Sequence, residues 1–460
     1  MAARLLPGHG GADGRPGRRR RPARRPVTGE RPPGLAVDDE VEVEATAFAH
    51  GGHCVARHAG QVLFVRHTVP GERVRARVTE VGAGGRFVRA DAVGVLQASP
   101  DRVEPPCPWS GPGRCGGCDL QHVSLPAQRR LKAGVVREQL ARLAGLDVDV
   151  DVEVEAVPGD RAGLGWRTRV EFAVDPGGRA GLRRHRSHEV VPVDVCRIAA
   201  DGVSALDVPG RPWPGAEVVD AVAPSVGDPV AVAVPGQDPP DVVERVRAAW
   251  TAVEGEGRLE RDFTVSARGF WQVHPGAAST FLAAAMEELA VRPGERALDL
   301  YSGVGLFAAA LSEAVGPSGQ VVAVEADRDA AARAEAALAG AGNVVVLAAR
   351  VDDAFGVPRP QRRRGRGRAT RASRSPLLPP RADLVVLDPP RTGAGTAVVA
   401  AVARLRPRAL AYVACDPAAL ARDTAALEEH GYRLSRLRAF DAFPMTHHVE
   451  CVAHFVRRPA

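Results

Sequence analysis

The strongest constraint on the fold is a regular alternation of apolar runs and alanine-rich segments that begins near Ser266. The apolar runs read RALDL, QVVAVE, NVVVLAA, DLVVLD and ALAYVA. Apolar strands separated by helical segments are typical of a parallel sheet that carries helices on both faces. The sequence therefore predicts an α/β fold, with a Rossmann-like domain over residues 266–460.

The first apolar run leads into a glycine turn, in RALDLYSGVGLFAAAL. Gly303 and Gly305 allow the backbone to approach a ligand at the carboxyl edge of the sheet, where open α/β folds bind. The third glycine of a dinucleotide fingerprint is missing, and Glu325 ends the next run, where a carboxylate can hold both ribose hydroxyls. A bare adenosyl ligand such as S-adenosylmethionine suits this pairing better than NAD. Asp352, after the third run, is either a contact on the adenine side or a helix N-cap.

Asp388 closes the fourth run, in VVLDPPRTG, and two prolines follow it. Because prolines donate no backbone hydrogen bond and hold a rigid turn, they fix Asp388 at the carboxyl edge of the sheet. Asp-Pro-Pro after an apolar strand is typical of methyltransferases that act on planar nitrogen heterocycles, whereas the alternative is a plain strand-ending turn.

Cys415 ends the fifth run, in VACDPAALARD, and precedes a helix. A lone thiol on a strand is commonly core filling. A helix N-terminus, however, is expected to lower its pKa and make it a nucleophile. Glu450, in THHVECVAHFV, is a carboxylate in an apolar segment, where a charge is costly unless it is functional or paired. Thiol, carboxylate and adenosyl site together indicate methylation at carbon 5 of a pyrimidine, in which a thiolate adds to carbon 6 and a base removes the carbon 5 proton.

The sequence has seven cysteines, an odd number in a chain with no recognisable secretory signal, which argues against a disulfide framework. Three lie close together in CPWSGPGRCGGC and a fourth lies in PVDVCRIA. These four are Cys107, Cys115, Cys118 and Cys196. Four such thiols suit either zinc or an iron–sulfur cluster, and the spacing alone does not choose between them.

The regions before residue 266 have different patterns. Residues 34–99 alternate apolar and polar positions between glycine-rich turns, which predicts a small antiparallel barrel. Residues 100–265 are predicted to form an irregular α+β domain. Residues 1–33 and the insert 355–381 are rich in arginine and are predicted to be disordered. Since the whole chain carries a net charge of only +6, any nucleic-acid surface is expected to be a local patch aided by these two arms.

The composition of the chain makes its basic residues weak evidence for any function. Lys132 is the only lysine among 61 basic residues, so the abundance of arginine reflects a compositional bias and is weak evidence for RNA binding. No apolar run reaches the roughly 18 residues of a membrane span, and the N-terminus lacks the apolar stretch of a secretory signal. We therefore expect a cytoplasmic protein with no membrane partner.

The chain resembles the RNA uracil-C5 methyltransferase family, which makes 5-methyluridine in tRNA and 23S ribosomal RNA. The resemblance runs from about Ala36 to Phe455 and rests on RVEPPCPWSGPGRCGGCDLQH, ARGFWQVHP, LDLYSGVGLF, LDPPR, VACDPAALARD and HHVECV. It implies a class I methyltransferase domain over 266–460, a TRAM RNA-binding domain over 34–99, and a [4Fe-4S] cluster in 100–265. The ligands of that cluster would be Cys107, Cys115, Cys118 and Cys196.

The resemblance also implies roles for single residues. Cys415 would be the nucleophile, Glu450 the base, and Asp388 a contact to the uracil or to the methionine end of the cofactor. The S-adenosylmethionine site would be lined by Gln272, Tyr301, Glu325 and Asp352, beside the turn of Gly303 and Gly305. Two features depart from the family: Leu306 stands where relatives often carry an asparagine, and the loop from Cys107 to Cys115 is longer than in the best-known relatives.

We therefore predict a monomeric, S-adenosylmethionine-dependent RNA methyltransferase that acts on carbon 5 of a uridine. The family's tRNA-specific branch typically lacks both cluster and TRAM domain, which favours ribosomal RNA as the partner. Three alternatives stay open: a tRNA 5-methyluridine methyltransferase, a nucleic-acid N-methyltransferase, and a non-catalytic RNA-binding protein with a vestigial cofactor fold. Asp-Pro-Pro also suits the second alternative, and Leu306 is the sequence feature that points to the third.

Overall fold

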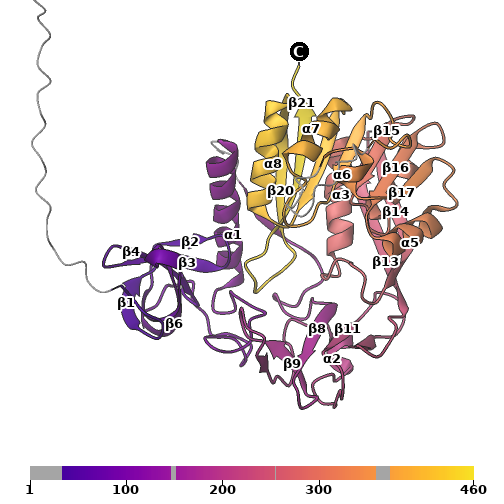
Figure 1. Cartoon of the computed structure of the whole chain (residues 1–460). Coiled ribbons are helices and arrows are strands. Elements are labelled where there is room, and N and C mark those ends of the chain that lie inside the picture. Colours follow the sequence, from indigo (N-terminus) through magenta and orange to yellow (C-terminus); the bar gives the residue numbers. More distant parts are fainter. Residues whose placement is uncertain (1–33, 147–151, 254, 359–372, 460) are drawn as a thin grey trace, which may run out of the picture.

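The computed structural model describes residues 34–146, 152–253, 255–358 and 373–459. The arm predicted for 1–33 and the centre of the predicted insert, 359–372, lie outside the described residues. A small barrel, a middle region and a larger α/β layer follow one another along the chain (Figure 1). Within the described ranges, no helix is long and apolar enough to cross a membrane.

The N-terminal barrel is one six-stranded sheet in the order β1-β5-β6-β4-β3-β2. Its elements are β1 (Glu40–Glu44), β2 (Ala47–Ala49), β3 (His53–His58), β4 (Gln61–Arg66), β5 (Arg73–Val81), the 3-10 turn η1 (Ala83–Gly85) and β6 (Val88–Gln97). Along β5, Val74, Ala76 and Val78 are buried and the arginines between them are exposed, as the period of a strand requires. β4 and β6 pair in parallel, so the sheet departs at this one pair from the predicted antiparallel barrel.

The middle region contains a five-stranded sheet in the order β10-β9-β8-β11-β12. Its elements are β8 (Arg169–Val174), β9 (Ala180–Arg183), β10 (Val190–Val191), the short helix α2 (Asp201–Ala205), β11 (Val218–Val222) and β12 (Val230–Val234). Phe172 and Val219 are buried in a core of its own, against which Cys196 packs. This region lies below the α/β layer in Figure 1.

The α/β layer is an eight-stranded sheet in the order β17-β16-β15-β18-β19-β21-β20-β7. The strands after residue 266 are β15 (Arg296–Leu300), β16 (Gln320–Glu325), β17 (Val344–Ala348), β18 (Leu384–Leu387), β19 (Ala409–Ala414), β20 (Tyr432–Asp441) and β21 (Glu450–Arg457). The first five of these pair in parallel and coincide with the five apolar runs of the sequence, which confirms the predicted α/β fold. β21 lies antiparallel between β19 and β20.

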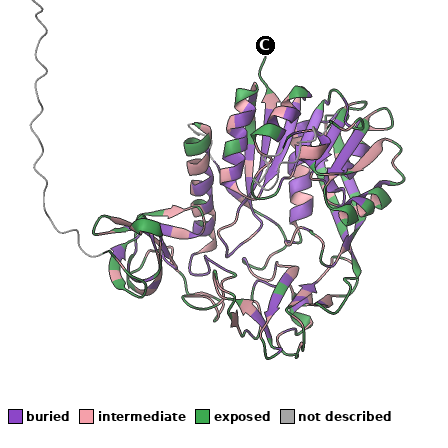
Figure 2. Ribbon diagram, viewed as in Figure 1, coloured by how far each residue is buried: buried purple, intermediate pink, exposed green. Residues whose placement is uncertain are grey.

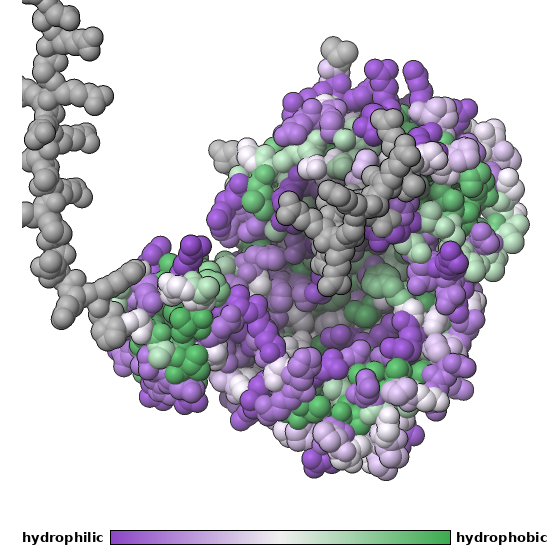
Figure 3. All heavy atoms as spheres, in the orientation of Figure 1, coloured by the Kyte–Doolittle hydropathy of each residue, from purple (hydrophilic) through white to green (hydrophobic). Residues whose placement is uncertain are grey.

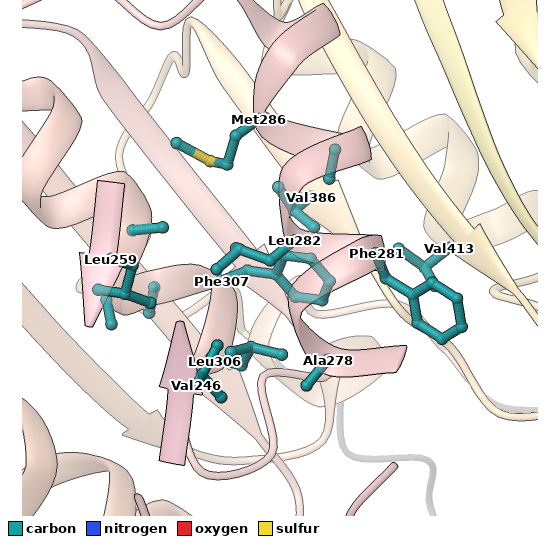
Figure 4. Packing of buried hydrophobic residues seen from close by; sticks show 14 of the residues in the cluster. Val246, Leu259, Ala278, Phe281, Leu282, Met286, Leu306, Phe307, Val386 and Val413 are labelled. Atoms are coloured by element: carbon teal, nitrogen blue, oxygen red, sulfur yellow. The ribbon is translucent and has the colours of Figure 1, made fainter. Parts of the chain in front are cut away.

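Helices cover both faces of this sheet. They are α3 (Ala277–Leu289), α4 (Leu306–Val315), α5 (Arg328–Leu338), α6 (Val351–Ala354), α7 (Thr396–Arg404) and α8 (Pro417–Glu429). Phe281, Leu282 and Phe307 of α3 and α4 pack with Val413 on one face (Figure 4), and α6, α7 and α8 pack on the other. Because both faces are covered, every residue of β18 and β19 is buried, and the sheet is buried through most of its width (Figure 2).

Three segments that precede residue 266 also pack on this layer. β7 (Val154–Ala156) is an edge strand of the sheet, parallel to β20. The hairpin of β13 (Asp241–Thr251) and β14 (Glu256–Ser266) packs against α3, α4 and α5. Helix α1 (Leu125–Gln139), with the π turn η2 (Leu140–Ala144), packs against α8. Phe355 and Leu378, inside the range predicted as an insert, are buried as well.

Candidate active site

A cavity of about 1280 Å³ lies between the carboxyl edge of the parallel strands and the middle region. Figure 3 shows the molecule hollowed between these two parts. Every residue predicted to be catalytic or to bind the cofactor lines this cavity, except Gly305. The residues that do so are Gln272, Tyr301, Gly303, Glu325, Asp352, Asp388, Cys415 and Glu450.

The glycine turn after β15 fixes the carboxylate of Glu325. The Gly303 N–H donates to Glu325 Oε2 at 2.8 Å, and the Asp327 N–H donates to Oε1 at 2.7 Å. Gly303 has a φ of +54° and nothing within 4 Å of the point where a Cβ would lie, so a ligand can approach its backbone closely. The carboxylate is therefore held in place by the backbone before any ligand binds.

Gly305 has a different role from the predicted one. It is the N-cap of α4 and has a φ of +90°. A Cβ there would lie 3.0 Å from Leu338 Cδ1 and 3.4 Å from Ala334 Cβ, both on α5. The absence of a side chain thus lets α4 and α5 pack, whereas the open space beside the backbone lies at Gly303.

Asp352 lies in the first turn of α6, and the N-cap of that helix is Arg350. The alternative that made Asp352 the N-cap is therefore wrong. Its carboxylate accepts from Arg350 Nε at 3.1 Å and from the Asp353 N–H at 3.0 Å. Tyr301 lies opposite in a left-handed conformation, with φ +66°. Burial, aided by the charge of Asp352, raises the pKa of Tyr301, so its hydroxyl is neutral and can donate a hydrogen bond.

The ladder between β19 and β21 brings Cys415 next to Glu450. Ala414 pairs with Cys451 in this antiparallel ladder, so the residues that follow one strand and begin the other meet at the cavity. Asp388 reaches the same place from the end of β18, which pairs with β19. Three side chains that are far apart in sequence are therefore neighbours because of one strand order.

The charges around Cys415 oppose the predicted effect of the helix. Burial, together with the charge of Glu450, raises the pKa of Cys415 to about 11. The N-cap of α8 is Asp416, whose side chain accepts the Ala419 N–H at 2.7 Å. The prediction that the helix N-terminus lowers the pKa of Cys415 is therefore wrong for the protein without ligands.

Two carboxyl groups beside Cys415 have unusual pKa values. Glu450 is only 3% exposed, and burial, together with the charge of Asp388, raises its pKa well above the usual range. Burial, together with the charge of Glu325, raises the pKa of Asp388 to about 7. Arg391 is the cation whose charge lowers the pKa of both Cys415 and Glu450. Sequence reasoning missed Arg391, although it follows the two prolines of LDPPR directly.

Other residues of the cavity were not predicted either. The side chain of Phe270, close to Gln272, is 77% exposed although it is large and apolar. His447 Nδ1 donates to Asp119 Oδ2 at 2.6 Å, and the rings of His447 and His448 lie 4.1 Å apart. Three of the motifs that carried the family resemblance contain these residues: ARGFWQVHP has Phe270, HHVECV has both histidines, and RVEPPCPWSGPGRCGGCDLQH has Asp119.

Asp299 links β15 to helix α4, next to the glycine turn. It is fully buried on β15, and its Oδ2 accepts the Ala308 N–H of α4 at 2.8 Å, while Oδ1 has no hydrogen-bond partner among the described residues. Burial raises its pKa to about 8. The signal in the sequence was an acidic residue inside the apolar run RALDL.

A second cavity, of about 410 Å³, contains the four cysteines that were predicted to bind metal: Cys107, Cys115, Cys118 and Cys196. Burial raises the pKa of Cys115 to about 11, and it also raises the pKa of Cys118 and Cys196. Among the described residues, no group of three or more His, Cys, Asp or Glu side chains is arranged to hold a metal ion. The thiols thus share one cavity without being drawn together to coordination distance.

Comparison with known proteins agrees with this architecture. Residues 262–458 match the family model "tRNA (Uracil-5-)-methyltransferase", and residues 38–93 match the TRAM domain. An "Uncharacterized RNA methyltransferase" of Streptomyces coelicolor is 48% identical over 447 residues, which cover 91% of this chain and 93% of that protein. The 23S rRNA (uracil(1939)-C(5))-methyltransferase RlmD of Shewanella amazonensis is 30% identical over 453 residues, which cover 91% of this chain and 96% of that protein.

One solved structure covers nearly the whole chain. The crystal structure of Pyrococcus abyssi tRNA (uracil-54, C5)-methyltransferase in complex with S-adenosyl-L-homocysteine aligns with a TM-score of 0.60 and 20% identity, over 90% of this chain and 99% of that one. At that identity the likeness shows the fold, a class I methyltransferase layer. Motifs, geometry and relatives agree, and the chain belongs to the S-adenosylmethionine-dependent RNA uracil-C5 methyltransferases, with an N-terminal TRAM domain.

Proposed function

We propose that this chain forms 5-methyluridine in 23S ribosomal RNA through a covalent bond between Cys415 Sγ and carbon 6 of the target uracil. One observation carries the proposal: a single cavity holds a thiol, the buried carboxyl group of Glu450, the half-buried one of Asp388, and a glycine turn that suits an adenosyl group. An N-methyltransferase has no use for a thiol beside a buried glutamate. This cavity therefore favours chemistry at carbon 5.

The residues around the glycine turn suit S-adenosylmethionine. Glu325, already oriented by two backbone N–H groups, would take the ribose hydroxyls, and the open space at Gly303 would admit the adenosyl group. Asp352 would lie on the adenine side, and Gln272, Tyr301 and Asp388 would line the remainder of the site. When bound, S-adenosylmethionine supplies an electrophilic methyl group. Leu306 is 9% exposed and packs in the core, so the asparagine that relatives often carry there has no counterpart in the cavity.

The chemistry of the uracil follows from Cys415 and Glu450. Cys415 first loses its thiol proton to solvent in the cavity; the thiolate then adds to carbon 6, and the electrons of the carbon 5–carbon 6 double bond move to the carbonyl oxygen on carbon 4. Carbon 5 of this enolate then takes the methyl group. Glu450 accepts the carbon 5 proton, the double bond forms again, and the Sγ–carbon 6 bond breaks. A carboxylate with a raised pKa is a stronger base, which suits Glu450 to this step.

Identity to the Shewanella enzyme over nearly the full length supports ribosomal RNA as the substrate. The Pyrococcus structure is named as a tRNA methyltransferase, and it also covers 90% of this chain. The overall architecture is therefore shared with an enzyme for tRNA, and the presence of a TRAM domain does not separate the two substrates. The tRNA activity stays the second candidate because the matching family model carries that name as well.

We also propose that Cys107, Cys115, Cys118 and Cys196 hold a [4Fe-4S] cluster. The donor set is suitable, since such clusters are held by four cysteine thiolates, and all four thiols line one cavity. A bound cluster would cross-link the loop 107–118 to the middle region, and its iron can also carry an electron.

The proposal is tested by release of tritium from RNA labelled at carbon 5 of uridine. Methylation at carbon 5 expels that hydrogen to water, whereas N-methylation leaves it in the RNA. We expect S-adenosylmethionine-dependent release from unmodified 23S rRNA fragments and much less from unmodified tRNA. Methyl transfer without tritium release would support the N-methyltransferase alternative. A protein that binds RNA but shows no S-adenosylmethionine binding by calorimetry would support the non-catalytic one.

A further inference from the structure

The segment 442–449, between β20 and β21, ends at Glu450 and forms one wall of the catalytic cavity. Phe443, Thr446, His447 and His448 line the cavity from this segment. Helix α1 lies on the opposite side of the same segment and contacts it through buried polar side chains. Two of these, Gln128 and Lys132, do not line the cavity.

Lys132 provides the first attachment. Its side chain is 0% exposed, and Nζ donates to Asp441 Oδ1 at 2.5 Å and to the Phe443 carbonyl at 3.1 Å. Asp441, at the end of β20, is also 0% exposed. A buried ammonium group is costly unless it is paired and fully hydrogen-bonded. In a chain whose other 60 basic residues are arginines, this site keeps the compact ammonium that can reach both acceptors.

Gln128 provides the second attachment, one helical turn before Lys132. Its side chain is 0% exposed, and Oε1 accepts the Met445 N–H at 2.9 Å. Its Nε2 donates to the Leu120 carbonyl at 3.1 Å and to the Val123 carbonyl at 2.9 Å. The Met445 carbonyl in turn accepts the N–H groups of Asp119 and Leu120 at 3.0 and 2.9 Å.

The backbone conformation of Met445 shows that these contacts hold the segment in an unfavourable geometry. It has a φ of +66°, a left-handed conformation that is unfavourable for a residue with a side chain. Such conformations persist when the surrounding hydrogen bonds determine them. Both polar groups of the Met445 backbone are bonded, one to Gln128 and the other to the backbone at 119–120.

We propose that Gln128 and Lys132 are positioning residues for removal of the carbon 5 proton: they hold the segment 442–449 so that Glu450 reaches carbon 5 after methyl transfer. In this step the carbon 5–hydrogen bond breaks, the proton passes to a Glu450 oxygen, and the Sγ–carbon 6 bond breaks as the double bond forms again. The inference rests on the proposed roles of Cys415 and Glu450. Cys415 itself is held by β19 and α8, so attack on carbon 6 depends little on this attachment.

The two steps can therefore be separated by experiment. If Glu450 is displaced while Cys415 is not, the methylated RNA stays covalently attached to the protein. We expect Gln128→Met to accumulate this adduct with ordinary, unfluorinated RNA on a denaturing gel, and to slow tritium release about 100-fold, as displacements of about 1 Å can. Formation of the adduct and the affinity for S-adenosylmethionine are expected to change less than about threefold.

Matched variants separate positioning from loss of fold. Gln128→Glu keeps an oxygen for the Met445 N–H but sets its other oxygen against the Leu120 and Val123 carbonyls in a buried site, so it is expected to accumulate adduct and to melt at a lower temperature. The pair Lys132→Met with Asp441→Asn removes both buried charges together and the bond to Phe443, and is expected to accumulate adduct. Arg130→Met, on the same helix at a surface pair with Asp101, is expected to behave like the wild type. Thermal melts identify any variant that fails to fold, and Gln128→Met tests the proposal without changing a charge.

Glu450→Gln is the reference variant with which adduct formation in Gln128→Met is compared. Adduct in Glu450→Gln but none in a folded Gln128→Met would overturn this inference and leave the proposed function intact. A folded Gln128→Met that loses adduct formation and turnover together would also overturn it. No adduct in Glu450→Gln would instead remove the proposed role of Glu450, and this inference with it.

Discussion

Two cavities lined by cysteine thiols lie side by side in this molecule, and they differ in what else faces the sulfur. They share a wall formed by Gly116, Gly117, Arg167 and His185. In the larger cavity one thiol, Cys415, lies near the carboxyl groups of Glu450 and Asp388 and the guanidinium group of Arg391. The smaller cavity is lined by four cysteines.

We infer that the neighbours of a cysteine, more than its own strand or helix, decide its chemistry. In the proposed reaction, Glu450 lies beside the thiol as the acceptor of the carbon 5 proton in the last step. Among other thiols, the shared preference is for a soft metal or an iron–sulfur cluster. The wall between the cavities is tightly packed, because a Cβ at Gly116 would lie 2.5 Å from the backbone nitrogen of His185.

The largest expected effect is on Cys415. Cys415→Ala should lower methyl transfer by about 10⁴-fold or more, as loss of a nucleophile does, while iron content and the melting temperature stay near those of the wild type. The measurement is tritium release under single turnover. Cys451→Ala is the matched control: this thiol is 0% exposed in the core beside Glu450. It should keep its turnover and lose about 1 kcal/mol of unfolding free energy. Equal turnover in Cys415→Ala and the wild type would contradict the account.

Glu450→Gln should have the next largest effect. Removing the base should lower turnover by about 10²- to 10⁴-fold, the range of general base catalysis. The affinity for S-adenosylmethionine, measured by calorimetry, should not change, because Glu450 is not among the residues proposed to hold the cofactor. A loss of turnover that merely follows a loss of cofactor affinity would argue against a role as the base.

Cys118→Ala tests the second cavity in the same way. We expect the wild-type protein, purified without oxygen, to be brown and to contain about four irons per chain. The variant should lose most of the iron and melt at a lower temperature, since the energy of binding a structural metal contributes to folding. Removal of iron from the wild type with a chelator should lower the melting temperature in the same direction. A colourless wild type with one zinc would contradict the cluster.

The smallest expected effect concerns the pKa of Cys415. With a pKa of about 11, the free thiol should react with iodoacetamide at pH 7 about 100-fold more slowly than a thiol with the ordinary value of 9.0. The rate should still rise above pH 10, because a raised pKa moves thiolate formation to higher pH. Glu450→Gln should speed this reaction by removing a charge that raises the pKa, and Arg391→Met should slow it. A plateau below pH 8 in the wild type would contradict this environment.

The sequence predicted the α/β layer well because its strands are buried on both faces. Five uninterrupted apolar runs became five parallel strands, and the glycine turn and Glu325 followed from their position at the ends of two of them. The register of β21 could not be predicted, since it depends on β21 pairing with β19 and β20 at once. For the same reason Cys451 and Glu450 could be seen in the sequence as neighbours, but not as neighbours of Cys415.

The predicted direction of the pKa shift of Cys415 was wrong for a related reason. The helix that follows it is local and visible in the sequence, whereas burial and the charge of Glu450 arise only from the folded sheet. Gly305 shows the same limit, because its requirement for no side chain comes from Leu338 and Ala334 on another helix. Arg391 was missed because an arginine in so arginine-rich a chain carries little information.

The central claim is that Cys415, and no other cysteine, bonds to carbon 6 of the target uracil. It is tested most directly by trapping the protein on RNA that contains 5-fluorouridine, in which fluorine replaces the hydrogen that Glu450 must remove. We predict a stable adduct that needs S-adenosylmethionine for methyl transfer, with mass spectrometry placing the uridine on the peptide VACDPAALAR. An adduct on another cysteine, or an undiminished adduct in Cys415→Ala, would contradict the account.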